Sequence, residues 1–292
     1  MKDIIVIVGP TGVGKTKLSI ELAKKIDAEI INGDSVAIFK DLNIGSAKPT
    51  KKEQENIPHH LIDSKEIEED YSVYNYQKDV RKTIDEITKR GKRIILVGGT
   101  GLYIKAALFD YQFEEEKEKK DYSNLTNEEI IEKIKKLSNE EIKDEKNRRR
   151  LERLLNKLEE SSLITHNKDN CLYPIKVFGL TTDREVLYER INNRVDEMIE
   201  NGLLEEVNSL KEKYENSRIL NSAIGYKEFY DYFYKNKDLE EVIQEIKTNS
   251  RRFAKRQYTF FRNQFPTTWI ETNFKDFNQT VEEVFKQIET NH

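Results

Sequence analysis

The segment GPTGVGKT, residues 9–16, has the residue types and the spacing of a phosphate-binding loop. It matches the pattern G-x-x-x-x-G-K-[ST] with Gly9, Gly14, Lys15 and Thr16. In such loops glycines let backbone N–H groups converge on an anion, the following helix adds its dipole, and the lysine supplies a positive charge. The Thr16 hydroxyl is placed to reach a Mg²⁺ ion that bridges phosphate oxygens. The predicted phosphate-binding residues are Gly9, Pro10, Thr11, Gly12, Val13, Gly14, Lys15 and Thr16.

Asp34, in the segment EIINGDS, is a carboxylate that follows a short apolar run. Beside a phosphate-binding loop, it can act as a general base that faces an acceptor group, as in small-molecule kinases. A purine-triphosphate hydrolase needs a further acid at the end of a later apolar run, and the run that ends ILVGGTGLY has none. We therefore predict that Asp34 is a base; the alternative is that it caps the next helix.

The loop and Asp34 both follow apolar runs that are typical of buried strands. Continuous apolar runs of this length fit strands covered on both faces, so we predict an α/β fold with a doubly wound parallel sheet. Ligands bind such sheets at the carboxyl ends of the strands. The loop, Asp34 and Thr100 should therefore lie along one edge. The predicted strands are residues 4–8, 29–32, 93–98, 176–181 and 268–270.

The composition changes between residue 114 and about residue 165. A charged connector is followed by apolar residues at helical spacing, without a strand pattern. We predict a small helical insertion domain at 114–165, set into a core that comprises 1–113 and 166–292 with helices toward the C-terminus. In KNRRRLERLLNKL, at the base of the insertion, leucines lie on one helical face and basic residues on the other.

Composition and charge exclude several classes of protein. The single cysteine, Cys171, excludes a disulfide framework and a cysteine-based zinc site. The N-terminal apolar run of residues 4–8 is too short for a signal peptide or a membrane span, so we expect a cytoplasmic protein without membrane contact. The net charge of −4 means that RNA could be bound only through local basic patches.

One such patch is RRFAKRQYTFFRNQF, residues 251–265, which has five basic residues, five aromatic residues and no acid. On a helix, Phe253 and Phe260 would point to the side opposite a basic stripe. Basic residues with an aromatic, backed by a core face, suit phosphate contacts and base stacking. The predicted stripe comprises Arg251, Lys255, Tyr258 and Arg262.

Six segments together resemble the bacterial tRNA dimethylallyltransferases. They are GPTGVGKT, NGDSVAIFKDLNIGSAKPT, IPHHLID, LVGGTGLYIKA, AIGYKE and AKRQYTFFR, in the order seen in that family and over nearly the whole chain. The resemblance implies a P-loop kinase-like core and transfer of a dimethylallyl group from dimethylallyl diphosphate. The acceptor would be N6 of the adenosine that follows the anticodon on its 3′ side, in tRNAs reading codons that begin with U. The products would be N6-dimethylallyladenosine and diphosphate.

The resemblance also implies roles for individual residues. The loop would hold the leaving diphosphate, with Mg²⁺ as cofactor on Thr16. Asp34 would accept a proton from the adenine amine, and Thr100 could donate a hydrogen bond to the diphosphate. Arg194 matches the arginine that contacts the diphosphate in the family. Arg190, one turn earlier, is either a second such contact or an ordinary solvent-facing arginine.

The expected partners are dimethylallyl diphosphate and the anticodon stem-loop of a tRNA, whose target base must leave its stack. We expect a monomer that binds one tRNA, and we interpret the histidine pair in IPHHLID as structural. Ala37 departs from the family, in which many members carry glutamine at this position, and the insertion is shorter than usual. The predicted tRNA-binding residues are Asp34, Ser35, Val36, Ala37, Arg149, Arg150, Arg153, Gly225, Tyr226, Lys227, Lys255, Arg256, Tyr258 and Arg262.

Two other functions share some of these features. A small-molecule or nucleoside kinase would use the same loop and Asp34, but it leaves the basic aromatic segment unexplained. An RNA-binding protein with a regulatory NTPase would explain the basic segment, but it needs the missing strand-end carboxylate. Both require a bound nucleotide, whereas a dimethylallyl transfer would not consume ATP.

Overall fold

The computed structural model describes residues 2–111, 113, 122–138, 142, 145, 147–159, 169–214 and 217–290. The chain forms two compact units. The first contains Met1–Phe109 and Asp169–His292, and the second contains Asp110–Lys168. Within these ranges, no helix combines the length and the apolar character that a membrane span requires.

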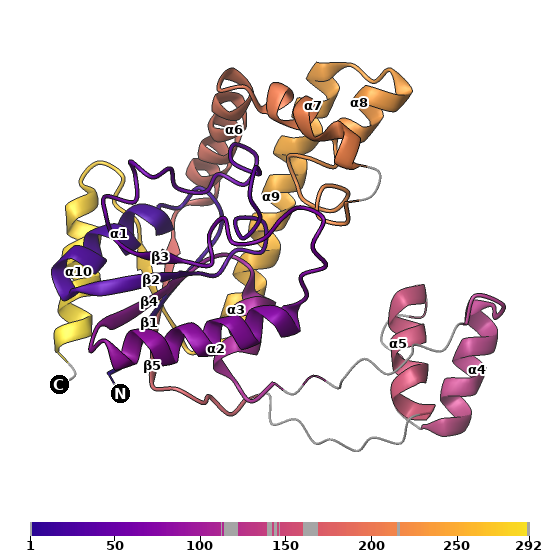
Figure 1. Ribbon diagram of the computed structural model, residues 1–292, viewed down its shortest axis with the longest axis horizontal. Coiled ribbons are helices and arrows are strands. Elements are labelled where there is room, and N and C mark those ends of the chain that lie inside the picture. The colour runs from indigo at the N-terminus through magenta and orange to yellow at the C-terminus, as the bar shows by residue number, and fades with distance from the viewer. Residues whose placement is uncertain are drawn as a thin grey trace. The chain divides into compact units, whose positions relative to one another are not determined.

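The first unit is built on a six-stranded sheet in the order β3-β2-β4-β1-β5-β6, and every pairing in it is parallel (Figure 1). The five predicted strands are confirmed with small shifts at their ends. The additional edge strand β3 was missed because two histidines carry no apolar pattern. The strands are β1 (Ile4–Val8), β2 (Ala28–Asn32), β3 (His59–His60), β4 (Arg93–Val97), β5 (Ile175–Thr181) and β6 (Thr267–Glu271).

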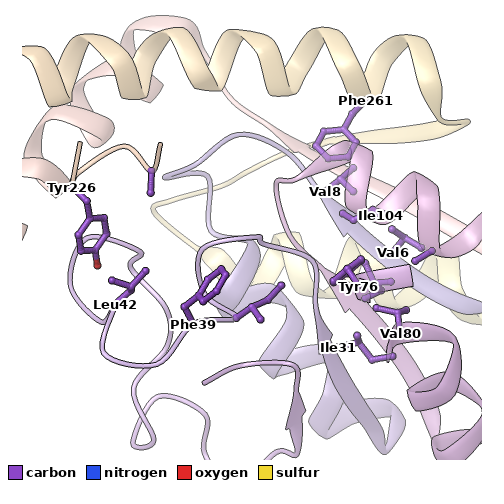
Figure 2. Packing of buried hydrophobic residues seen from close by; sticks show 14 of the residues in the cluster. Val6, Val8, Ile31, Phe39, Leu42, Tyr76, Val80, Ile104, Tyr226 and Phe261 are labelled. Carbon is purple, nitrogen blue, oxygen red and sulfur yellow. The ribbon is translucent and has the colours of Figure 1, made fainter. Parts of the chain in front are cut away.

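Strand β1 is buried on both faces because its side chains alternate between two cores. Ile4, Val6 and Val8 belong to one hydrophobic cluster, whereas Ile5 and Ile7 belong to a second cluster across the sheet. The doubly wound arrangement predicted from the unbroken apolar runs is therefore confirmed. Figure 2 shows part of the first cluster, in which strand residues pack with side chains from the covering helices.

Helices cover both faces of the sheet (Figure 1). The second cluster is closed by α1 (Lys15–Ile26) and α10 (Phe277–Glu289). The first cluster is closed mainly by α2 (Val73–Lys89), α3 (Gly101–Leu108) and α9 (Leu239–Gln264). The remaining helices of this unit are α6 (Arg184–Glu200), α7 (Leu203–Tyr214) and α8 (Phe229–Lys235).

The second unit contains α4 (Asn127–Leu137) and α5 (Arg148–Glu159). Helix α4 begins with a capping box in which Thr126 and Glu129 satisfy each other's backbone N–H groups. The two helices share a small core that includes Ile130, Leu151 and Leu155. A helical insertion with a buried leucine face was predicted at this place; its assigned contact with tRNA stays a prediction.

Candidate active site

The phosphate loop connects β1 to α1, and its glycines adopt backbone conformations that other residues rarely reach. Gly9 has φ 138°, and a Cβ atom there would lie 2.7 Å from the carbonyl oxygen of Leu180. Gly14 has φ 97°, and its Cβ would lie 2.8 Å from the ring of Phe277. The loop therefore needs glycine both for its left-handed turns and for its close packing. Helix α1 begins directly afterwards at Lys15, as the loop pattern requires.

Lys15 brings a positive charge into this loop. Its Nζ donates a hydrogen bond to the carbonyl oxygen of Pro10 at 2.8 Å. Burial lowers the pKa of Lys15 to about 8; the negative charge of Asp34 opposes this shift, and the positive charge of Arg194 adds to it. The side chain is thus protonated at neutral pH, in a place where desolvation strengthens its pull on an anion.

Helix α6 places two arginines beside the loop. Arg194 donates to the hydroxyl of Thr11 at 2.9 Å and to the carbonyl oxygen of Ala47 at 3.2 Å, and burial lowers its pKa. Arg190 donates to the carbonyl oxygen of Gly12 at 3.0 Å, and its guanidinium lies 3.9 Å from the ring centre of Phe274. Both arginines line a pocket of about 610 Å³ together with the loop and the first turns of α1. For Arg190, which the sequence left open, this position favours a role at the phosphate site.

Asp34 lies at the carboxyl end of β2, beside the end of β4. Its Oδ1 accepts a hydrogen bond from the backbone N–H of Gly99 at 3.1 Å. Its own backbone N–H donates to the side chain of Asn32 at 3.0 Å, which fixes the turn. No helix begins in the fully described stretch between β2 and β3, so the alternative that Asp34 caps a helix is wrong.

Thr100 lies next to Asp34, at the start of α3. Its Oγ1 is 3.5 Å from Asp34 Oδ1 and accepts the backbone N–H of Ser35 at 3.1 Å. The backbone N–H of Thr100 also donates to the carbonyl oxygen of Gly33 at 3.1 Å. The predicted meeting of Asp34, Thr100 and the phosphate loop at one edge of the sheet is confirmed.

Residues 251–264 of the basic segment lie in α9, and the side chains of Lys255, Arg256 and Arg262 are exposed. The buried side of the helix is formed by Ala254, Gln257 and Phe261. Phe253 and Phe260, which were expected to form that side, are only half-buried. The predicted stripe was therefore correct for Lys255 and Arg262. It was wrong for Arg251, which is half-buried and donates to Asn192 and Thr248, and the core face is formed by other residues than predicted.

Tyr258 was predicted to belong to this exposed face, but the structure places it elsewhere. Its ring packs at 5.3 Å from Trp269, and its hydroxyl contacts Thr181 and accepts the backbone N–H of Thr182 at 3.3 Å. The side chain is half-buried. In this position the ring packs on the sheet and is not offered to a base.

The residues of the segment AIGYKE also differ in their exposure. Tyr226 was predicted to contact tRNA, but its side chain is fully buried, and its hydroxyl donates to Glu206 at 2.7 Å. Burial and this carboxylate raise the pKa of Tyr226, so the hydroxyl keeps its proton. Lys227 keeps about two fifths of its side chain exposed. Gly225 is buried as well, and its backbone N–H donates to Glu228 at 2.9 Å. Of the three predicted residues in this segment, Lys227 is the one with an exposed side chain, and its contact with tRNA stays a prediction.

The remaining tRNA-binding predictions differ in exposure. Ser35 and Val36 are half-buried beside Asp34, whereas the side chain of Ala37 is buried. In α5, Arg149 and Arg150 are exposed. The side chain of Arg153 lies outside the described residues.

Two residues that the sequence analysis missed organise this site. Gln257 is buried and bonds to the phosphate loop and to Gly99. Glu206, on α7, accepts hydrogen bonds from backbone N–H groups of the segment that precedes Ala47. The carbonyl oxygen of Ala47 in turn accepts a hydrogen bond from Arg194. Gln257 could have been found from the sequence, because it is a polar residue at a core position of an amphipathic helix. No comparable sequence signal marks Glu206. The N–H donors to Glu206 are those of Asn43, Ile44 and Gly45.

The histidine pair contacts protein groups. His60 Nε2 lies 2.6 Å from Glu29, and His59 Nδ1 lies 2.7 Å from the carbonyl oxygen of Ile57. Among the described residues, no group of three or more histidine, cysteine or acidic side chains could hold a metal ion. These contacts fit the structural interpretation of the pair.

Comparison with known proteins identifies the family. The model of the IPP transferase family matches residues 37–264. A tRNA dimethylallyltransferase of Bacillus mycoides is 45% identical over 285 residues, which cover 92% of this chain and 90% of that protein. The relative from Bacillus anthracis is 45% identical with similar coverage. The chain belongs to the tRNA dimethylallyltransferase family.

Solved structures of this family have the same fold. The tRNA isopentenylpyrophosphate transferase of Staphylococcus epidermidis is 37% identical, with a TM-score of 0.77 and full coverage of both chains. The Bacillus halodurans enzyme is 38% identical with a TM-score of 0.78, over 99% of this chain and 96% of that one. A eukaryotic dimethylallyltransferase described as acting on tRNA is 26% identical, with a TM-score of 0.82 over 100% of this chain and 79% of that one. The resemblance stated from the sequence motifs is confirmed, and so is the P-loop kinase-like fold.

Proposed function

We propose that this protein transfers a dimethylallyl group from dimethylallyl diphosphate to N6 of the adenosine that follows the anticodon in tRNAs reading U-starting codons. The observation that supports this most directly is the position of Asp34. Its carboxylate lies at the same sheet edge as a phosphate loop lined by Lys15 and Arg194, so a proton acceptor and a cradle for a leaving anion adjoin each other.

In the proposed step, the bond between C1 of the dimethylallyl group and the diphosphate oxygen breaks while a bond from adenine N6 to C1 forms. The proton of the N6 amine passes to the Asp34 carboxylate, and the diphosphate leaves with the electron pair of the broken C–O bond. General bases of this kind typically contribute about a hundred- to ten-thousandfold. Negative charge grows on the diphosphate, so the loop N–H groups, Lys15, Arg194 and Thr100 act where charge develops.

The donor set at the loop also fits a Mg²⁺ ion. Magnesium is commonly held by few protein oxygens, with water and substrate phosphates completing its shell, and the exposed Thr16 at the start of α1 offers one hydroxyl. When bound, the ion would neutralise part of the diphosphate charge. The Thr16 hydroxyl would orient it.

The tRNA would be contacted through exposed cations, chiefly Lys255, Arg256 and Arg262 on α9, together with Lys227. The half-buried Ser35 and Val36 would line the place where the extruded adenine meets Asp34. Exposed cations suit contacts with the tRNA phosphates, and such contacts contribute affinity without distinguishing one base sequence from another. We further propose that the protein acts in the cytoplasm as a monomer that binds one tRNA.

The decisive experiment is nucleoside mass spectrometry. Purified protein is incubated with an unmodified tRNA that carries adenine after its anticodon, with dimethylallyl diphosphate and Mg²⁺, in the presence and in the absence of ATP. We expect the adenosine to gain one C5H8 unit without ATP. A matched tRNA with guanosine at that position should stay unmodified.

The kinase alternative predicts the opposite result. If no C5H8 adduct forms and ATP is consumed in a way that depends on an added acceptor, the loop binds a nucleotide and the proposal fails. ATP consumption that depends on RNA, without an adduct, would favour the NTPase alternative.

A further inference from the structure

We propose that Gln257 is a positioning residue that sets the distance between the diphosphate cradle and the proton acceptor. This inference rests on the function proposed above. Gln257 touches neither proposed substrate group; it connects two loops, each of which carries one half of the site.

The contacts of Gln257 use both ends of its amide. The side chain Oε1 accepts the backbone N–H of Thr11 at 3.0 Å, and Nε2 donates to the carbonyl oxygen of Gly99 at 3.0 Å. Only 4% of the residue is exposed, so both bonds are shielded from bulk water. Buried polar groups left without partners cost roughly 1–3 kcal/mol each, which holds the two loops to this geometry.

These two bonds form the centre of a continuous hydrogen-bonded chain. On one side, the N–H of Gly99 donates to Asp34 Oδ1 at 3.1 Å. On the other side, the hydroxyl of Thr11 accepts from Arg194 at 2.9 Å. The proposed base and the proposed diphosphate-binding arginine are thus connected through Gln257 and the two residues that it bonds.

The chemistry of this position suits an amide. A single side chain must offer an acceptor to Thr11 and a donor to Gly99 at the same time, and the glutamine amide does so with its oxygen and its nitrogen. The approach is close: a Cβ atom on Gly99 would lie 2.0 Å from Gln257 Nε2. Glycine at 99 therefore lets the amide reach the backbone.

The consequence for catalysis is geometric. Reacting atoms must lie about 3–3.5 Å apart with the correct alignment, and a misplacement of about 1 Å can cost roughly a hundredfold in rate. Without Gln257, the loop that carries Thr11 and the loop that carries Gly99 would lose their common anchor. The base and the leaving group could then shift relative to each other, although each half of the site would still be present.

The test compares two buried glutamines. Gln77 on α2 is also buried, at 6% exposure, and its Nε2 donates to the carbonyl oxygen of Ala106 at 2.7 Å. Gln257→Met and Gln77→Met remove the same group from a buried place with little change of volume. For both variants and the wild type we would measure the melting temperature, the Kd for tRNA, the KM for dimethylallyl diphosphate and the single-turnover rate.

We expect both variants to lose thermal stability, and only Gln257→Met to lose rate. Its single-turnover rate should fall at least about tenfold, up to roughly a hundredfold, while its Kd for tRNA stays within about twofold of the wild type. Equal rates for the two variants would overturn the proposal and leave the proposed function intact. A wild type that forms no adduct would instead reject the proposed function.

A second variant keeps the test decisive if Gln257→Met does not fold. Gln257→Glu retains an acceptor for Thr11, but an ionised carboxylate cannot donate to Gly99, whereas the protonated acid can. We expect its rate, divided by that of the wild type at each pH, to rise as the pH falls. A constant ratio across the pH range would contradict the positioning role.

Discussion

The sheet edge at the phosphate loop and the exposed face of α9 both bear polar side chains, but these are held in different ways. At the sheet edge, Lys15, Arg194 and Gln257 are partly or fully buried and bond to protein groups. On α9, Lys255 and Arg262 are exposed. Buried groups in fixed places suit catalysis, because hydrogen-bond donors must already be in position where charge develops in the transition state. Exposed cations suit the binding of a polyanion through many weak contacts.

This comparison predicts that changes at the sheet edge affect rate, and that changes on α9 affect affinity and its dependence on salt. Tyr258, which lies on the predicted stripe but is half-buried against Trp269, should affect neither property strongly. Each of these expectations can be tested separately.

The largest effect is expected for Lys15→Met. Removal of a charge that faces the leaving diphosphate should lower kcat/KM by about a hundred- to a thousandfold. Steady-state kinetics with labelled dimethylallyl diphosphate would measure this change. Lys24→Met is the control, because Lys24 lies on the same helix but pairs with Glu21 and Glu55; a similar loss in both variants would contradict a specific role.

Lys15 also predicts a pH dependence. Because its pKa is lowered to about 8, the ammonium loses its proton as the pH rises through that value, and the affinity of the free protein for dimethylallyl diphosphate should fall there. In Lys15→Arg the charge persists, so this dependence should disappear. Isothermal titration between about pH 7 and pH 9.5, a range that spans this pKa, would detect it; a flat wild-type profile would contradict the expectation.

The next effect is expected for Asp34→Asn. The amide oxygen can still accept the N–H of Gly99, but it cannot take up the proton from N6, so the single-turnover rate should fall at least about a hundredfold. The Kd for tRNA, measured by filter binding, should not change. An unaltered rate would exclude Asp34 as the base and weaken the contrast between the two regions.

A smaller effect is expected for Lys255→Ala on α9. Loss of one phosphate contact should weaken tRNA binding and reduce the slope of log K against log salt by about 0.7 to 0.9. The rate with saturating tRNA should stay close to that of the wild type. Lys286→Ala, an exposed lysine on α10, is the matched control; if Lys255→Ala showed the same salt slope as that control, α9 would not contact phosphate.

The smallest effect is expected for Tyr258→Phe. The variant loses the hydrogen bonds to Thr181 and Thr182, which should lower the free energy of unfolding by about 1 kcal/mol. Its affinity for tRNA should be unchanged because the ring packs on Trp269. Urea denaturation and filter binding would measure the two properties, and a clear loss of affinity would return Tyr258 to the RNA-binding face.

Much of this site could be predicted from local sequence. The phosphate loop is a contiguous pattern, and Asp34 directly follows a recognisable strand, so no knowledge of distant contacts was needed. The strands themselves were found because burial on both faces requires unbroken apolar runs. Edge strand β3 was missed for the same reason, because a two-residue edge strand of histidines has no such run.

The predictions for RNA-binding residues were less accurate because exposure depends on the rest of the chain. The helical stripe in α9 was set correctly for Lys255 and Arg262, but the same periodicity grouped the half-buried Arg251 and Tyr258 with them. Trp269 of β6 packs against Tyr258. Tyr226 looked available beside a lysine, and Glu206 of α7 holds its hydroxyl in the interior. Local patterns state which residues share a face, but they do not state what covers that face.

By itself, the sequence determined the local features of this protein: a loop with the pattern of a phosphate cradle, a carboxylate at a strand end, and a basic helix. These features depend on residue types at short spacing, which backbone geometry converts directly into a local arrangement. Only the tertiary structure decided which parts adjoin, because β4 lies between the strands that carry the loop and Asp34, and which buried groups connect these parts. The bonds of Gln257 to Thr11 and Gly99 join residues that are 246 and 158 positions apart, and contacts at such separations exist only after the helices have closed over the sheet.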